Sequence, residues 1–122
     1  MLAHAIGDAV LGALALGDLG KHFPDSDAKW RGVSSLVILE RIRQLTAEAG
    51  GRIVNVDSTL IAEAPKMAPH VPEMRRNLAR ALGIEPERVS VKATTNEGLG
   101  TIGRGEGIAA LAVALVEVPL RR

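Results

Sequence analysis

Apolar residues recur with a helical period in three parts of the chain. Residues 2–16 are mostly Ala, Leu, Val and Ile, and the polar residues His4 and Asp8 stand one turn apart on one face. A second helix is expected over 34–49, where a serine can cap its start and two glycines follow its end. A third is expected over 72–83, because proline suits the first turn of a helix and glycine its end.

Other apolar residues follow the period of a strand. Residues 52–62 are rich in β-branched side chains, and one face is expected to carry Val54, Val56, Ser58 and Leu60. A short strand is expected over 89–94, and a longer, largely buried one over 107–118. This order predicts one α+β domain over residues 1–122, a two-layer sandwich of a mixed β-sheet with helices packed on one face.

Composition narrows the functions that such a domain can have. Lysine and arginine total 15 against 14 acidic residues, and one Trp, one Phe and no Tyr leave little on which to stack bases. Nucleic-acid binding is therefore not expected. The apolar run 108–116 is too short to span a bilayer, so no membrane role is expected. The absence of cysteine excludes disulfides and thiolate metal sites, and a cytoplasmic protein is expected.

Two polar groups in the first quarter of the chain have both chemical and structural interpretations. His4 and Asp8 could share a metal, or the Asp could orient the His, but a local hydrogen bond would satisfy them equally well. The segment 17–27 places aspartates among glycines. Carboxylates there could accept hydrogen bonds from a polyol or hold a divalent ion, or they could simply stabilise a solvated turn.

Two later loops could form a nucleotide site. In the segment APKMAPH, prolines stiffen the backbone around Lys66, which could meet a phosphate while backbone groups face a flat ring; an ordinary connecting loop is the alternative. In KATTNEGLGTIGRGEGI, Thr94 and Thr95 could hold phosphate oxygens and Glu97 a magnesium ion. Arg104 could approach an anion or a second subunit, or the segment could be a hairpin loop with an Arg–Glu surface pair.

Four segments, taken in order, resemble the 2-C-methyl-D-erythritol 2,4-cyclodiphosphate synthases of the non-mevalonate isoprenoid pathway. They are HAIGDAVLGALALGDLGKHFPDSD, NVDSTLIAEAPKM, VKATTNEGLG and GRGEGIA. The resemblance implies a homotrimer with active sites between subunits. It implies a lyase that converts 4-diphosphocytidyl-2-C-methyl-D-erythritol 2-phosphate to the 2,4-cyclodiphosphate: the 2-phosphate attacks the β-phosphorus and CMP leaves.

The resemblance also implies roles for individual residues. His4 matches a zinc ligand, and Glu97 matches the ligand of a magnesium or manganese ion between the α- and β-phosphates. Thr95 matches a catalytic residue that stabilises the transition state. The substrate-binding residues implied are Asp18, Gly20, Phe23, Pro24, Asp25, Ser26, Asp27, Ala62, Glu63, Ala64, Pro65, Lys66, Met67, Ala68, Thr94, Thr95, Asn96, Glu97, Thr101 and Arg104. Arg104 and Glu106 match the end of a central trimer channel.

Two departures from the family pattern stand out. The family's Asp-x-His pair, which supplies two further zinc ligands, and its His-Ser-Asp-Gly-Asp turn do not occur in the 122 residues, so an N-terminally truncated chain is expected. Thr101 stands where the family usually has Phe lining the channel. Two alternatives remain: a non-catalytic trimeric homologue that binds cytidine nucleotides, and the C-terminal part of a bifunctional cytidylyltransferase/cyclodiphosphate synthase. A plastid location is the alternative to the bacterial cytoplasm.

Overall fold

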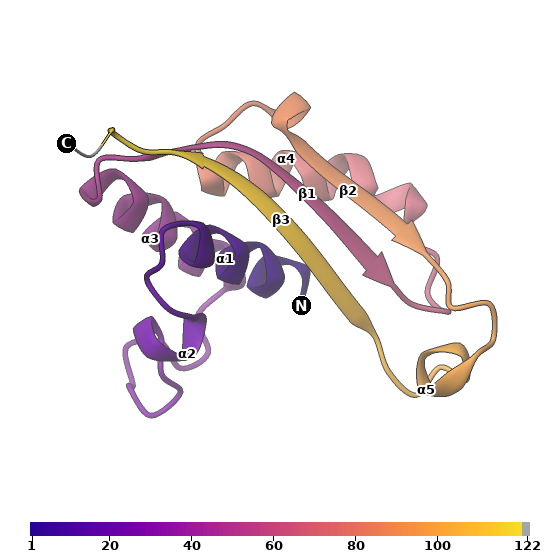
Figure 1. Cartoon of the computed structure of the whole chain (residues 1–122). Helices are drawn as coiled ribbons and strands as arrows, with labels where there is room; N and C mark the ends of the chain where they lie inside the picture. The colour runs from indigo at the N-terminus through magenta and orange to yellow at the C-terminus, as the bar shows by residue number, and fades with distance from the viewer. Residues whose placement is uncertain (121–122) are drawn as a thin grey trace.

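A computed structural model describes residues 1–120 of the chain, and Figure 1 shows its arrangement. A three-stranded sheet runs through the molecule with helices along it. The elements, in chain order, are α1 (Leu2–Ala13), α2 (Leu19–His22), α3 (Ser35–Glu48), β1 (Arg52–Ile61), η1 (Ala68–His70), α4 (Val71–Leu82), η2 (Pro86–Arg88), β2 (Val89–Thr94), α5 (Gly100–Gly103) and β3 (Ala109–Glu117). The predicted α+β class is confirmed.

The sheet is mixed, with strand order β2-β1-β3. β1 runs parallel to β2, with Ile61 opposite Thr94 at the end of the pairing, and antiparallel to β3. A parallel pair needs a crossover connection, and α4 supplies it between β1 and β2. The central strand therefore brings residues from the middle and the end of the sequence into one sheet.

The signals at helix ends act largely as the sequence predicts. The Ser34 hydroxyl accepts a hydrogen bond from Leu36 N (3.3 Å) at the start of α3, and α4 ends at Gly83 with a left-handed φ of 70°. α1 ends at Ala13 rather than at Leu16, because Ala15 already has a φ of 56°. Neither α2 nor α5 was expected, since four residues are too few to show a helical period.

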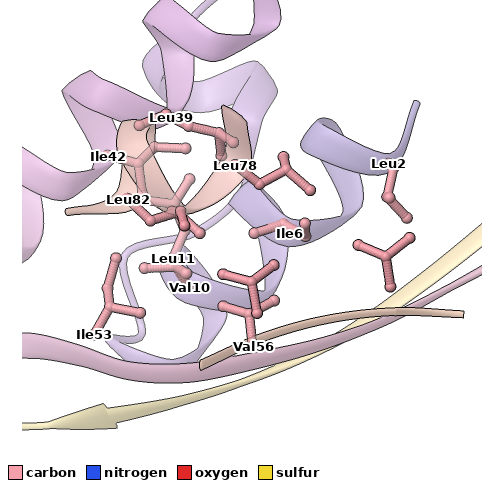
Figure 2. Close-up of a cluster of buried hydrophobic side chains, with 14 of the residues drawn as sticks. Leu2, Ile6, Val10, Leu11, Leu39, Ile42, Ile53, Val56, Leu78 and Leu82 are labelled. Carbon is pink, nitrogen blue, oxygen red and sulfur yellow. The ribbon is translucent and has the colours of Figure 1, made fainter. Parts of the chain in front are cut away.

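One apolar core lies between the helices and the inward face of the sheet (Figure 2). Ile6, Val10 and Leu11 of α1 meet Leu39 and Ile42 of α3, and all five are fully buried. The sheet contributes Ile53, Val56, Leu60, Val89 and Val91, and α4 contributes Leu78, Ala79, Ala81 and Leu82. The longer helices α1, α3 and α4 thus pack on the same face of the sheet, with α1 mainly over β3 and α4 over β2.

Two strand predictions are wrong in part. Val54 does not share the buried face of β1, because the register of β1 against β3 shifts between Ile53 and Asn55 and Ile53 turns inward instead. β3 is not largely buried in the single chain. Its small residues Ala110, Ala112 and Ala114 face the core, while Leu111, Val113 and Leu115 are 61%, 73% and 59% exposed on the opposite face.

An ion pair lies on the same outward face as the exposed residues of β3. Lys92 Nζ of β2 is 2.9 Å from Asp57 Oδ2 of β1. The hydrogen bond from the Lys92 ammonium is the main reason that the pKa of the Asp57 carboxyl lies below its usual range.

Within residues 1–120, no helix is long and apolar enough to cross a membrane.

Shortening Ile42 tests the core. We expect Ile42→Ala to lower the free energy of unfolding by about 3 kcal/mol, because the site is fully enclosed and the removed atoms leave a cavity. Val37→Ala on the same helix is the matched control and should change it by less than about 1 kcal/mol, since Val37 is 44% exposed. Urea denaturation measures both, and equal losses would contradict this description of the core.

Removing the ammonium beside Asp57 tests the ion pair. In Lys92→Met the pKa of Asp57 should rise toward its usual range, as followed by carboxyl NMR titration. The folded state holds the pKa of Asp57 low. The pair therefore stabilises the native chain at pH values above the pKa that aspartate has in the unfolded chain. The contribution disappears as pH falls through the folded pKa. Lys29→Met, away from this pair, should leave the Asp57 titration unchanged.

Candidate nucleotide-binding site

Two loops leave the same edge of the sheet. Because β1 and β2 are parallel, their carboxyl ends lie side by side, and the segments 62–68 and 95–99 begin there although some thirty residues separate them. Ala62 N donates a hydrogen bond to Thr94 O (3.0 Å), which continues the strand pairing into the loops. In Figure 1 both arrowheads point toward the end of the molecule where α5 lies.

A pocket of about 160 Å³ opens between these two loops. Its lining combines apolar residues with one lysine, one glutamate and two threonines, and the Ala64–Pro65 peptide bond is cis. The lining residues are Leu60, Ala62, Glu63, Pro65, Lys66, Met67, Ala68, Ala93, Thr94 and Thr95. An apolar cavity of about 500 Å³ adjoins it, sharing Leu60, Ala62, Pro65 and Met67 and reaching the start of α1. The pocket can therefore accept a flat ring beside an anionic group.

The segment that follows β2 is folded back on itself. Thr95 Oγ1 accepts a hydrogen bond from Glu97 N (3.2 Å), and Glu97 has a left-handed φ of 53°. A Cβ atom at Gly103 would collide with the backbone of Gly98, so only glycine permits this close approach. Thr94, Thr95 and Glu97 are all exposed; the two threonines line the pocket, and Glu97 follows two residues later in the chain.

The candidate substrate residues of segment 18–27 lie elsewhere. None of them lines the pocket, and α2 lies beside α1, far from α5 (Figure 1). Asp18 caps α2 by accepting from Lys21 N (3.0 Å), and Asp27 accepts from Lys29 N (3.0 Å). Phe23, one of the substrate-binding residues that the resemblance implies, is 6% exposed, with its ring centroid 4.7 Å from that of Trp30.

His4 stands exposed on α1, and its Nε2 lies 3.5 Å from the Ser35 hydroxyl. Asp8 does not orient it: Asp8 Oδ1 accepts a hydrogen bond from Leu19 N (2.9 Å) and so ties α2 to α1. Sequence reasoning missed this role because the two residues are eleven positions apart in different elements. Among residues 1–120, no three metal-ligating side chains come together, so His4 with its neighbours here does not form a closed zinc site.

Thr101 and Arg104 lie further along the segment that follows β2, outside the pocket. Thr101 is exposed in α5. Arg104 Nε is 2.9 Å from Glu106 Oε2, so the Arg–Glu surface pair considered from the sequence is present. The structure thus gathers Thr94, Thr95 and most of segment 62–68 around one pocket, with Asn96 and Glu97 next in the chain, and leaves the remaining candidates outside it.

Comparisons with known proteins show the family of the chain. The model of the YgbB family matches residues 1–117. The 2-C-methyl-D-erythritol 2,4-cyclodiphosphate synthase of Syntrophomonas wolfei is 56% identical over 117 residues, which cover 96% of this chain and 74% of that protein.

Solved structures give the same result. The bifunctional IspDF from Campylobacter jejuni matches with a TM-score of 0.89 at 39% identity, over 94% of this chain and 31% of that one. A 2C-methyl-D-erythritol-2,4-cyclodiphosphate synthase in its CDP-bound form matches with a TM-score of 0.85 at 33% identity, over 94% and 74%. The chain therefore belongs to the YgbB family, as its resemblance to the 2-C-methyl-D-erythritol 2,4-cyclodiphosphate synthases predicted.

Proposed function

We propose that the pocket between segments 62–68 and 94–97 binds the cytidine diphosphate part of 4-diphosphocytidyl-2-C-methyl-D-erythritol 2-phosphate. The chain is then the cyclodiphosphate synthase domain, a phosphorus–oxygen lyase of isoprenoid precursor biosynthesis. The observation that carries this proposal is a pocket that both loops line, with a cation and two hydroxyls among its lining residues. A relative of similar fold is described with CDP bound, which supports the same ligand here.

The two loops divide the work of binding. Backbone groups of 62–68 face the cytosine, and the Lys66 ammonium meets a phosphate oxygen. Because the Thr95 oxygen already accepts the Glu97 N–H, its own O–H remains free to donate to a phosphate oxygen. Such a donor can stabilise charge that develops as the substrate's 2-phosphate attacks the β-phosphorus. The protein needs no nucleophile of its own, because the substrate supplies it.

Divalent cations enter this proposal in two ways. Glu97 fits magnesium or manganese, since these ions are commonly held by one or two carboxylates together with substrate phosphates, and its carboxylate is exposed beside the pocket. When bound there, the ion would neutralise charge on the diphosphate. His4 could supply one zinc ligand, but a zinc site needs further ligands that residues 1–120 do not bring to it.

The complete site is built from two chains of a homotrimer. Segment 18–27 carries seven of the implied substrate-binding residues, yet it lies outside the pocket of its own chain. A neighbouring subunit could bring it there. The exposed stripe of Leu111, Val113 and Leu115 offers an apolar surface for that assembly, because such a stripe on a sheet face is costly in water.

Changing Lys66 tests the nucleotide site. We expect the wild-type chain to bind CDP in calorimetry, and Lys66→Ala to weaken CDP about tenfold, because a charge-assisted hydrogen bond to phosphate is lost. Cytidine, which has no phosphate, should lose less than about twofold. Arg76→Ala on the exposed side of α4 is the charge-matched control and should bind both ligands normally. A folded wild-type protein that does not bind CDP would refute the proposal.

Placing a charge in the exposed stripe tests the assembly. Light scattering should give a trimer for the wild-type chain, and Val113→Asp should shift it toward monomer, since Val113 is the most exposed of the three stripe residues. Val37→Asp, at an exposed apolar position on α3, is the matched control and should remain trimeric. A wild-type monomer at high concentration would contradict the assembly.

A further inference from the structure

The side chain of Glu63 crosses from one loop of the pocket to the other. Glu63 lies two residues beyond β1, and its Oε1 accepts hydrogen bonds from Asn96 N (3.0 Å) and Gly98 N (3.1 Å). The side chain is half-buried. Together with the main-chain bond from Ala62 N to Thr94 O, it fastens segment 94–98 to segment 62–68.

The two N–H groups that Glu63 occupies form a concave anion site. Glu97 and Gly98 follow each other with left-handed φ values of 53° and 75°, and the N–H groups of Asn96 and Gly98 point at one oxygen. Backbone curled in this way commonly binds phosphate or carboxylate. Here the anion is the chain's own carboxylate, so these two N–H groups are not available to a diphosphate while the contact lasts.

We propose that Glu63 is a positioning residue, which sets the spacing between the loop that holds the nucleoside and the loop that holds the diphosphate. This inference rests on the proposed function, because it assigns the two loops to the two parts of CDP. A ligand that spans both loops binds more tightly when their spacing is already set, since less motion is lost on binding. The carboxylate acts through the backbone of Asn96 and Gly98, from whose N–H groups it accepts hydrogen bonds.

The charge of Glu63 and its role as a cross-link predict opposite effects on ligand binding when the side chain is removed. As an anion beside a diphosphate site, Glu63 should repel the ligand, and its removal should then strengthen binding. As a cross-link, it needs only an acceptor oxygen at this place, and its removal should weaken binding. Glutamine keeps the acceptor oxygen and loses the charge, so Glu63→Gln and Glu63→Ala separate the two effects.

The experiment compares CDP and cytidine by calorimetry on the wild-type protein, Glu63→Gln and Glu63→Ala. We expect Glu63→Ala to weaken CDP about tenfold, while cytidine changes less than about twofold. Glu63→Gln should bind CDP at least as tightly as wild type. Glu73→Ala, an exposed glutamate on α4, is the control for loss of one carboxylate and should bind both ligands normally. Amide hydrogen exchange at Asn96 and Gly98 should be faster in Glu63→Ala only.

Three results would overturn the inference while leaving the nucleotide site intact. They are a Glu63→Ala protein that binds CDP as tightly as wild type, one that binds it more tightly, and a Glu63→Gln protein that fails as Glu63→Ala does. If wild type itself does not bind CDP, the proposed function fails, and this inference fails with it.

Discussion

Parallel pairing of β1 with β2 is the constraint on which the candidate site depends. It brings the ends of two strands, distant in sequence, to one edge of the sheet, and the last pair of the ladder is Ile61 with Thr94. Parallel strands require a crossover, and the amphipathic helix α4 supplies it while covering β2. A site at the carboxyl ends of neighbouring parallel strands is a recurring outcome of such topology. If β3 lay between β1 and β2, Lys66 and Thr95 would follow strands that are not neighbours.

Much of this architecture could be predicted from local signals in the sequence. The cap at Ser34 and the left-handed Gly83 act within a few residues, so both can be recognised in the sequence alone. Residue types in 62–68 and at Thr94 and Thr95 suggested a nucleotide site, the family resemblance implied that they bind substrate, and they line one pocket in the structure. What could not be predicted depends on distant partners. The T-shaped contact of Phe23 with Trp30 and the register shift after Ile53 exist only once the chain has folded.

Side chains that connect separate elements are the least visible in the sequence. His4 and Asp8, one turn apart, suggested a shared metal ion or an imidazole that the aspartate orients. The Asp8 carboxylate instead accepts from Leu19 N across a loop. Glu63 similarly looked like one member of the loop 62–68, and the groups that donate hydrogen bonds to it proved to be backbone N–H groups of the loop that follows β2. In both cases a carboxylate accepts hydrogen bonds from the backbone of another segment, and that segment carries candidate binding residues.

The alternation along β3 places its larger side chains away from its own core. Three alanines face α1, and the leucines and valine on the other side carry most of the strand's apolar volume. Because the inward alanines are small, a helix can pack close to this strand. For the same reason the strand buries little apolar surface in its own chain and adds little hydrophobic stabilisation. If that face is covered by copies of the same chain, native stability becomes a property of concentration as well as of sequence. Folding and association would then be a single equilibrium, in which dilution acts as a denaturant.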